Sequence, residues 1–537
     1  YLPPDNIQQS PVYRVANRTS PTNIGIMLLS VLAARDFDFI DTDGLYTRIE
    51  RTLSTVESLP MWEGNLYNWY DTLTLDTLKP EFVSTVDSGN FICCLVALAE
   101  GLGELVREKP ALKDLITRIE RLIENTNLNA LYNKKKNLFS IGYDVDQQAL
   151  TGSHYDFLMS EARLTSYYAV ARKLVGKKHW GSLNRTMSRS GSYAGAVSWT
   201  GTMFEYYMPH LLLPVYDGSL VGEALDYCLY CQKRRGARAG VPWGISESAF
   251  YAFDNNLNYQ YKAHGVQKLG VKRHLDRELV ISPYSTFLTV PVAPNSSMAN
   301  LARLQELGVY GRYGFFEAVD FTAERVGKGS LAVTRSYMAH HIGMSMVASC
   351  NALFQNKMQK RFMSNHYMRS AQEFLQEKIA KDTVIYDELT VESRGSEKHE
   401  RPVIREERRI ISPQSPRATL ITNGELTDIL TDTGAGWLAL GETDLTRRST
   451  DLLRRCQGIF TLVRMNGTTL CATQAPFFDE KAEYRVEHQD RSVTYYAEKK
   501  EVQLGVRCMM HPTISCEQRQ IVVKNTSARK QAAQLLI

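Results

Sequence analysis

The sequence has little cysteine, no long hydrophobic run and no excess of one charge, and each absence excludes a class of protein. Its nine cysteines are an odd number and sparse for 537 residues, which favours reduced thiols and a cytosolic setting over a disulfide framework. No unbroken apolar run reaches the ~18 residues of a membrane span. A net charge of +5, from 63 basic and 58 acidic residues, gives no strong electrostatic case for nucleic acid or an anionic membrane.

Several catalytic and metal-binding motifs are also missing. The segment Gly244-Ile-Ser-Glu-Ser lacks the closing glycine of a nucleophile elbow, and Val326-Gly-Lys-Gly-Ser lacks the earlier glycine of a phosphate-binding loop. The lone Cys228-Leu-Tyr-Cys motif indicates buried helical thiols rather than zinc ligands. The adjacent pair His340-His lacks the spacing of a helical metal site. We therefore expect no metal and no cofactor.

Apolar residues at helical spacing dominate residues 1–390, where loops with aromatic, acidic and glycine residues separate the helices. The alternation of strand and helix expected of β-α-β units is missing, which argues against a doubly wound sheet. Helices are predicted over residues 22–40, 45–59, 92–106, 113–127, 161–173, 222–233, 301–307, 337–355 and 368–379.

The character of the sequence changes towards its end. Residues 393–417 are charged, contain proline and have few core residues, as is typical of a linker. Short β-type runs follow, and Asn466-Gly separates two of them as in a tight hairpin. Residues 418–537 are therefore expected to form an antiparallel β-sandwich, incomplete at its end. The first residue is a tyrosine without a preceding methionine or signal peptide, and the last residues are apolar, so we expect both ends to be cuts from a longer protein.

Aromatic residues are the most unusual feature, because 28 tyrosines outnumber 19 phenylalanines. Tyrosine suits surfaces that are both apolar and wet, as sugar-binding clefts are. Loop clusters of aromatic, polar and carboxylate side chains occupy residues 66–72, 156–164, 198–208, 240–248 and 258–264. In such a cleft, Trp and Tyr faces would stack on sugar rings, while Asn and Asp would contact hydroxyl groups.

Most of these residues also have a purely structural interpretation. Asp87 precedes a helical run and could cap it. Glu161 lies near a helix start, where the dipole favours a carboxylate, and it could also pair with Arg163. Trp199 and Glu205 could be ordinary helix-start and core residues. The residues alone leave both interpretations open.

Glu247 has the surroundings that tune a catalytic carboxyl, since it lies on a Gly/Pro loop beside an aromatic residue. With the other templates excluded, paired carboxylates in an aromatic cleft remain. Paired carboxylates of this kind catalyse glycosyl transfer.

Ordered motifs across residues 1–390 resemble the central, glucoamylase-like region of cyclic β-1,2-glucan synthases. Residues 405–537 resemble the start of the β-sandwich that precedes the glycoside-phosphorylase region in these synthases, for example in Ile521-Val-Val-Lys-Asn-Thr-Ser. The motifs are Asn68-Trp-Tyr-Asp-Thr, Ser84-Thr-Val-Asp-Ser-Gly-Asn, Ser160-Glu-Ala-Arg-Leu, Trp199-Thr-Gly-Thr-Met-Phe-Glu-Tyr, Val241-Pro-Trp-Gly-Ile-Ser-Glu-Ser, Gly311-Arg-Tyr-Gly-Phe-Phe-Glu-Ala and Tyr337-Met-Ala-His-His.

This resemblance implies a mainly α fold, with an (α/α)₆ barrel over residues 1–392, a linker over 393–417 and a smaller antiparallel β-sandwich over 418–537. The implied activity is retaining transglycosylation: the enzyme cleaves linear β-1,2-glucan and re-forms β-1,2 linkages, including ring closure to cyclic β-1,2-glucan. Glu247 is the expected nucleophile and Glu161 the expected acid/base. The related endo-β-1,2-glucanases are inverting hydrolases with a similar barrel, and their matching loop lacks the carboxylate found here at Glu247.

The same resemblance implies a set of substrate-binding residues. A retaining pair of carboxyls ordinarily lies ~5–5.5 Å apart, and a substrate hydroxyl that relays the proton would allow a wider gap. The expected substrate-binding residues are Asn68, Trp69, Tyr70, Asp71, Asp87, Asn90, Tyr143, Trp199, Glu205, Trp243, Tyr259, Tyr284, Tyr313, Glu317, His340 and His341.

Two other functions stay open: an endo-β-1,2-glucanase that uses water, and a non-catalytic β-glucan-binding domain. The membrane-bound glycosyltransferase and the phosphorylase barrel of the synthases have no counterpart in this sequence, so neither synthesis from a nucleotide sugar nor phosphorolysis is expected. In the parent chain both regions would be partners, with this part at the cytoplasmic face of an inner-membrane protein. No nucleic-acid partner is expected.

Overall fold

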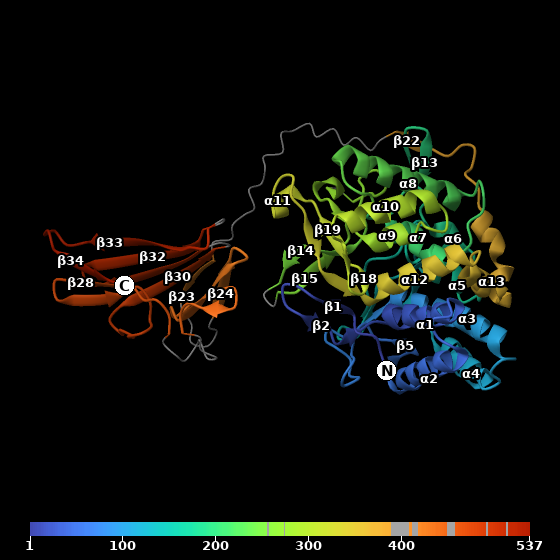
Figure 1. Cartoon of the computed structure of the whole chain (residues 1–537), viewed down its shortest axis with the longest axis horizontal. Coiled ribbons are helices and arrows are strands. Elements are labelled where there is room, and N and C mark those ends of the chain that lie inside the picture. Colours follow the sequence, from blue (N-terminus) through green and yellow to red (C-terminus); the bar gives the residue numbers. More distant parts are fainter. Residues whose placement is uncertain are drawn as a thin grey trace. The chain divides into compact units, whose positions relative to one another are not determined.

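The computed structural model describes residues 1–254, 257–272, 274–387, 407–410, 417–447, 457–489, 492–511 and 514–537. The chain divides into two compact units, Tyr1–Val391 (unit 1) and Glu392–Ile537 (unit 2). Figure 1 shows unit 1 from blue to yellow and the strands of unit 2 from orange to red. The predicted linker, residues 393–417, lies almost entirely outside the described residues.

Unit 1 is built mainly from helices. The longer ones are α1 (Pro21–Asp36), α2 (Thr42–Ser58), α3 (Thr85–Leu105), α4 (Leu112–Asn125), α5 (Arg163–Ala171), α8 (Leu220–Ala239), α10 (Pro294–Glu306), α12 (Ala339–Leu353) and α13 (Lys357–Ser364). The shorter ones are α6 (Lys178–Ser182), α7 (Met203–Tyr207), α9 (Pro283–Phe287), α11 (Ala323–Val326) and α14 (His366–Ser370), with 3₁₀ turns η1 (Leu128–Leu131), η2 (Met208–Leu211), η3 (Leu275–Arg277) and η4 (Gln372–Gln376).

The helices pack in two series. In the first, α1 packs against α3 and α12, α3 packs against α5, and α9 packs against both α7 and α12; Figure 1 shows α1 and α3 side by side. In the second, α2 and α4 cover α1 and α3, while α6, α8 and α10 cover α5, α7 and α9 respectively. Every residue of α5 is buried. The first series therefore forms the core of the unit, and the second surrounds it.

Helix α3 is long and apolar enough to resemble a membrane span, although the sequence has no unbroken apolar run of that length. In its most apolar window, 78% is buried inside the protein. It is packed by α1, α4, α5 and α13. A helix that is apolar on all sides and surrounded by others is a core helix of a globular unit.

The start of α3 differs from the prediction, because the helix begins at Thr85 rather than at residue 92. Ser84 is its N-cap and accepts a hydrogen bond from the Asp87 backbone N–H at 3.2 Å. Asp87 therefore lies in the first turn and does not cap the helix. This turn carries small and polar residues instead of an apolar stripe, so hydrophobic spacing did not reveal it.

Two other predicted helices are wrong in part. The predicted helix 337–355 begins only at Ala339, because β21 (Ser336–Met338) pairs with β1 (Asn6–Gln8) at the other end of the unit. The predicted helix 368–379 is instead two short pieces, α14 and η4. Cys228 and Cys231 are buried free thiols within α8, as predicted.

Short strands fill the loops between helices in unit 1. The strands that matter for the site are β14 (Ser248–Phe253) and β15 (Tyr259–Lys262), which form a hairpin, and β19 (Ala318–Asp320), which lies beside β14. The others are β2 (Arg14–Val15), β3 (Arg18–Thr19), β4 (Met61–Trp62), β5 (Asn65–Leu66), β6 (Tyr70–Asp71), β7 (Phe82–Ser84), β8 (Tyr132–Asn133), β9 (Leu138–Phe139), β10 (Gly142–Asp144), β11 (Ala149–Leu150), β12 (Met187–Ser190), β13 (Tyr193–Ala196), β16 (Val280–Ile281), β17 (Tyr310–Gly311), β18 (Gly314–Phe315), β20 (Ala332–Thr334) and β22 (Ile385–Asp387).

Unit 2 consists of antiparallel sheets. Their orders are β23-β30-β31-β32-β33, β24-β25-β26-β27 and β29-β28-β34. The strands are β23 (Glu407–Ile410), β24 (Ala418–Thr422), β25 (Leu426–Thr431), β26 (Gly436–Leu440), β27 (Thr443–Asp444), β28 (Leu462–Met465), β29 (Thr468–Cys471), β30 (Glu483–Gln489), β31 (Ser492–Lys499), β32 (Val502–Met510), β33 (Glu517–Asn525) and β34 (Ala533–Leu536).

Side chains from all three sheets share one core in unit 2, as in a sandwich. Val493 and Leu504 of the five-stranded sheet are buried in the same cluster as Leu430 and Val463 of the other sheets. The predicted hairpin is confirmed: Asn466-Gly467 joins β28 to β29, with φ values of 47° and 69°. Both values are left-handed, as a type I′ turn requires.

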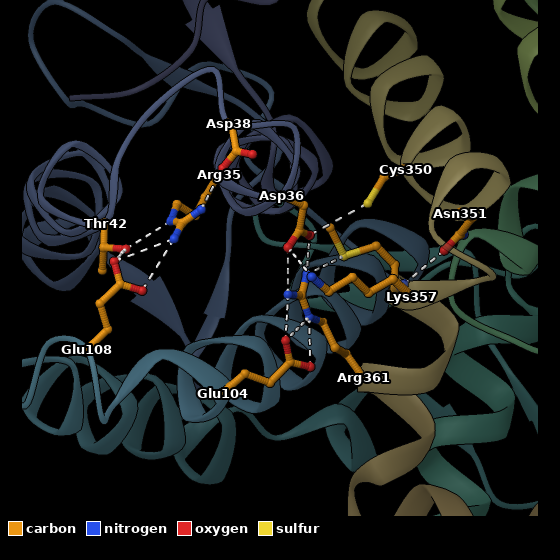
Figure 2. A network of polar contacts seen from close by, with 11 residues as sticks. Arg35, Asp36, Asp38, Thr42, Glu104, Glu108, Cys350, Asn351, Lys357 and Arg361 are labelled. Carbon is orange, nitrogen blue, oxygen red and sulfur yellow. Dashed lines mark hydrogen bonds and ion pairs between the residues drawn. The ribbon is translucent and has the colours of Figure 1, made fainter.

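A partly buried cluster of charges joins α1 and α3 of the core series to α13 (Figure 2). Arg361 on α13 donates to Asp36 on α1 at 2.5 and 2.9 Å and to Glu104 on α3 at 2.7 Å. Lys357 also donates to Asp36 at 2.5 Å. Burial alone would raise the pKa of Asp36, but its contacts with Arg361 and Lys357 outweigh burial and hold this pKa below its usual value.

Replacing Arg361 with Met should lower the free energy of unfolding by about 3–5 kcal/mol. The reason is that the buried carboxylate of Asp36 loses one of its two cationic partners. The side chains of Arg361 and Asp36 are only 1% and 5% exposed. The matched control is Lys357→Met, whose side chain is 35% exposed and whose loss should cost less than about 1 kcal/mol. Urea denaturation measures both, and equal losses would contradict the role given to Arg361.

Candidate active site

Several of the predicted site residues lie at the N-terminal ends of the core helices of unit 1. Asp87 lies in the first turn of α3, and Glu161 comes just before α5. Glu205, Tyr284 and His341 lie in the first turns of α7, α9 and α12. Each helix start aims free backbone N–H groups and a partial positive charge at its own end.

Side chains link these helix starts to one another. The Thr22 backbone N–H at the start of α1 donates to Asp87 at 3.4 Å, and the Asn90 amide donates to the Thr22 hydroxyl at 3.3 Å. His340 Nδ1 lies 3.0 Å from Asn23 Oδ1, which joins α12 to α1. The structure therefore brings Asp87, Asn90 and His340 close together around the start of α1.

Glu161 is partly buried and has an unusual proton affinity. Burial, followed by the negative charges of Glu205 and Glu247, raises the pKa of Glu161 to about 8. Its hydrogen bond from Ser160 Oγ, at 3.2 Å, opposes this shift. Arg163 does not pair with Glu161, because its guanidinium donates to backbone carbonyls instead. At neutral pH, Glu161 therefore holds a proton that it can donate.

Glu247 is the second partly buried carboxyl, and it lies just before β14. Burial raises the pKa of Glu247 to about 7, while the hydrogen bond from Tyr261 Oη, at 2.7 Å, lowers it. The charges of Glu205 and Asp87 raise it further. The pKa values of both carboxyls are raised, and the charge of Glu247 acts on Glu161. Two such carboxyls can serve as base or nucleophile and as acid.

Two tyrosines at this centre were not predicted. Tyr261 reaches Glu247 because β15 pairs with β14, with Tyr261 opposite Ala249. Tyr155 has a pKa well above its usual value, because it is buried and faces the charges of Glu161, Asp87 and Glu247. Polar and aromatic residues alternate over 258–262, as in a strand, and this pattern could have pointed to Tyr261. No local sequence pattern marks Tyr155.

Glu205 is held by protein donors on every side. Thr202 and Glu205 form a capping box at the start of α7. The Glu205 carboxylate also accepts from Ser198 Oγ at 2.9 Å and from Thr200 Oγ1 at 2.7 Å. Its side chain is buried. Glu205 therefore builds the helix start and places a negative charge near the other two carboxyls.

Glu317 and His341 also contact each other rather than open space. His341 Nδ1 lies 3.0 Å from both Glu317 oxygens. The side chains of His341 and Glu317 are 2% and 1% exposed, respectively. The ring of Tyr284 stacks on His341 with 3.5 Å between the ring centroids.

The predicted aromatic residues fall into exposed and buried groups. Trp199 and Tyr313 are 57% and 55% exposed, so they offer faces on which a sugar can stack. Trp69, Tyr143 and Tyr259 are partly buried, and their rings contact Arg18, Trp62 and Phe253 respectively.

Tyr70 and Trp243 lie inside the protein. Tyr70 Oη donates to the Pro60 carbonyl at 2.6 Å. The backbone of Trp243 exchanges hydrogen bonds with the Asn300 side chain. Both residues shape the loops from within.

The two remaining polar residues lie in the loop before α3. Asp71 accepts from the Leu73 and Thr74 backbone N–H groups at 2.7 and 3.0 Å, which fixes a turn. The Asn68 amide donates to Asp87 at 3.2 Å. Within the described residues, the buried Oδ1 atom of Asn68 has no hydrogen-bond partner.

Two family models match the chain, one within unit 1 and one within unit 2. Residues 154–366 match the Glycoamylase family model, and residues 400–536 match the glycosyl hydrolase 94 supersandwich domain. The cyclic beta-(1,2)-glucan synthase NdvB of Rhizobium meliloti is 30% identical over 98% of this chain. The chain spans 23% of the length of that relative.

Solved structures show the same fold for most of the chain. An endo-beta-1,2-glucanase from Chitinophaga pinensis, in complex with sophorotriose and glucose, has a TM-score of 0.58 at 16% identity, over 70% of this chain and 92% of its own. An endo-beta-1,2-glucanase from Talaromyces funiculosus, in complex with sophorose, has a TM-score of 0.55 at 15% identity, over 71% of this chain and 84% of its own. At these identities the likeness concerns the fold. The chain thus resembles the glucoamylase-like region of a cyclic β-1,2-glucan synthase together with the supersandwich that follows it.

Proposed function

We propose that this chain is a retaining transglycosylase that cleaves linear β-1,2-glucan and re-forms β-1,2 linkages, including ring closure. The observation that carries the proposal is the pair Glu161 and Glu247, two partly buried carboxyls just before α5 and β14, with the charge of Glu247 raising the pKa of Glu161. The 30% identity to a cyclic beta-(1,2)-glucan synthase supports β-1,2-glucan as the substrate.

The fold proposed for residues 1–392 is an (α/α)₆ barrel. Its inner helices would be α1, α3, α5, α7, α9 and α12, and its outer helices α2, α4, α6, α8, α10 and α13. The contacts from α12 through α1 and α3 to α5, and from α7 through α9 to α12, support this arrangement. Residues 393–417 would then be the linker, apart from β23 (Glu407–Ile410), which pairs with β30 in the β-sandwich formed by residues 418–537.

In the proposed mechanism, Glu247 attacks the anomeric carbon of a glucose unit while Glu161 protonates the oxygen of the leaving chain. The C1–O bond breaks as a covalent bond to Glu247 forms. Glu161, now ionised, next removes the proton from the 2-hydroxyl of an acceptor glucose, whose oxygen displaces Glu247. If the acceptor is the far end of the same chain, the product is a ring.

Transfer must outcompete attack by water. The exposed rings of Trp199 and Tyr313 support a proposed set of acceptor sites. A sugar hydroxyl held in attack geometry gains effective concentration over bulk water. The other predicted substrate-binding residues would position the chain or build the walls around it.

Product chain lengths test the proposal. Incubated with linear β-1,2-glucan of one length, a transglycosylase yields both longer and shorter chains. A hydrolase, the second candidate, yields only shorter chains, and the likeness to endo-beta-1,2-glucanases favours it. ¹H NMR of fresh products separates the two mechanisms further, because retention releases β anomers first and inversion releases α anomers. Binding without turnover would indicate a glucan-binding domain.

The pH dependence of kcat/KM follows from the two carboxyls. We expect a bell-shaped profile in which kcat/KM rises near pH 7, as Glu247 ionises, and falls near pH 8, as Glu161 loses its proton. Because the carboxyls interact, both limbs report on the pair. Initial transfer rates across this range measure the profile. Full activity down to about pH 5 would contradict the raised proton affinity of Glu247.

We also propose that the chain works beside other regions of a longer synthase, namely a membrane glycosyltransferase that supplies linear glucan and a phosphorylase region. Its place would be the cytoplasmic face of the inner membrane. Similarity to NdvB along 98% of this chain supports this setting.

A further inference from the structure

A row of contacts leads from the buried interior of unit 1 to Glu247. Glu317 contacts His341 Nδ1 at 3.0 Å, and His341 Nε2 lies 3.5 Å from Tyr261 Oη. Tyr261 Oη lies 2.7 Å from Glu247 Oε1. The row thus joins a carboxyl with no access to solvent to one that lies at the surface of the site.

With Glu247 ionised and His341 neutral, one arrangement of protons satisfies the whole row. Tyr261 has a single O–H, and its short contact with Glu247 uses it. His341 Nε2 must then donate to Tyr261, so Nδ1 of the neutral ring is an acceptor. Glu317 must therefore carry a proton and donate it to Nδ1. Its other oxygen accepts the Ala249 backbone N–H at 3.1 Å.

Electrostatics favour this same arrangement. Burial raises the pKa of Glu317 to about 8, although the nearby His340 opposes it. Burial lowers the pKa of His341 to about 3. Although Tyr261 is 40% exposed overall, local desolvation and the charge of Glu247 raise the pKa of its hydroxyl well above the usual value. At neutral pH, a protonated Glu317, a neutral His341 and a protonated tyrosine are therefore the stable forms.

The surroundings hold the row in place. Tyr284 stacks on His341 and donates its hydroxyl to the Glu247 carbonyl at 2.9 Å. The other charged groups that face the row are few. Asp5 acts on Glu317 and is itself paired with Arg18 at 3.1 Å. Glu205 and Asp87 act on Glu247 from α7 and α3.

We propose that protonated Glu317 is a positioning residue that acts through His341 and Tyr261 to keep Glu247 ionised and oriented for attack. Glu317 and His341 are too deeply buried to touch a sugar, whereas Tyr261 is 40% exposed and lies at the surface. If Glu317 lost its proton, His341 Nδ1 would donate to it instead. His341 Nε2 would then compete with Glu247 for the one proton of Tyr261. The catalytic part of this inference rests on the proposed role of Glu247.

The test compares two variants of similar size in the full chain. In Glu317→Gln, the amide N–H donates to His341 and the amide oxygen accepts from Ala249, which reproduces the protonated form. In Glu317→Leu, the donor is lost. Tyr261→Phe, at a residue 40% exposed, removes the hydroxyl that donates to Glu247. This variant tests the proposal even if Glu317→Leu does not fold.

The main readout is the titration of Glu247 itself, followed by difference infrared spectroscopy of its protonated carbonyl band. Glu247→Gln identifies this band by its disappearance. Loss of a hydrogen bond to a charged group should raise the pKa of Glu247 by about one unit in Glu317→Leu and Tyr261→Phe, while Glu317→Gln should leave it within about 0.3 units. This measurement needs no turnover, so it stands even if the proposed reaction is wrong.

Kinetics on linear β-1,2-glucan give the second readout. We expect kcat to fall about tenfold in Glu317→Leu, with KM unchanged, and to return to within about threefold of wild type in Glu317→Gln. Equal Glu247 titrations in Glu317→Leu and Glu317→Gln would overturn the proposal, as would an unchanged titration in Tyr261→Phe. A rise in KM alone would assign Glu317 to sugar binding instead. Full activity in Glu247→Gln would refute the proposed nucleophile without touching the infrared result.

Discussion

Replacing Glu247 with Gln should reduce the transfer of β-1,2-glucan by on the order of 10⁴-fold. The amide keeps the size of the side chain and still accepts the hydrogen bond from Tyr261 Oη, so the loss reflects the nucleophile and not the packing. Without a carboxylate, no covalent glycosyl-enzyme forms, and neither longer chains nor rings appear. Product analysis by mass spectrometry, over long incubations, measures the residual rate.

A chemical rescue distinguishes a nucleophile from a binding residue. In Glu247→Gly, azide can enter the space that the carboxylate vacates and attack the anomeric carbon from that face. We expect azide to restore cleavage and to yield an α-glycosyl azide, because only one inversion then takes place. Full activity of Glu247→Gln without azide would contradict the assignment.

Replacing Glu161 with Gln should lower kcat on β-1,2-glucan by about 10²–10⁴-fold, the usual contribution of a general acid. The carboxyl is protonated at neutral pH because burial and the charges of Glu205 and Glu247 raise its pKa. An amide cannot give that proton to the leaving oxygen. Initial rates at pH 7 measure the loss, and far-UV circular dichroism checks that the variant is folded.

A substrate that needs no acid separates Glu161 from Glu247. An aryl β-1,2-glucooligosaccharide has a leaving group that departs without a proton, so Glu161→Gln should release a first burst of the aryl group at close to the wild-type rate, whereas Glu247→Gln should release none. If neither substrate distinguished the two variants, the division of roles between the carboxyls would be wrong.

The location of the site could be predicted from sequence because its residues lie in local clusters. Asp87, Glu161 and Glu205 each stand beside the start of a helix, where polar residues interrupt an apolar pattern. The short helices α7 and α9 have only five residues each, too few for their spacing to be recognised. Their positions became clear only from the packing of α9 against α7 and α12.

Contacts between distant parts of the chain could not be predicted. Tyr261 reaches Glu247 through the β14–β15 pairing, and Arg361 meets Asp36 from the other end of unit 1. Glu317 and His341 were expected to bind substrate, yet the structure places their buried side chains against each other. A single sequence shows which residues are polar, but burial and partners depend on tertiary structure.

The most direct test of retaining transfer is mass spectrometry of linear β-1,2-glucan after incubation with the full chain in ¹⁸O-labelled water. Transfer makes and breaks glycosidic bonds without using water. The account predicts longer chains and rings, with rings lighter by one water than the linear oligomer and free of ¹⁸O. Products that are only shorter than the starting chain, each new reducing end carrying ¹⁸O, would contradict it and identify a hydrolase.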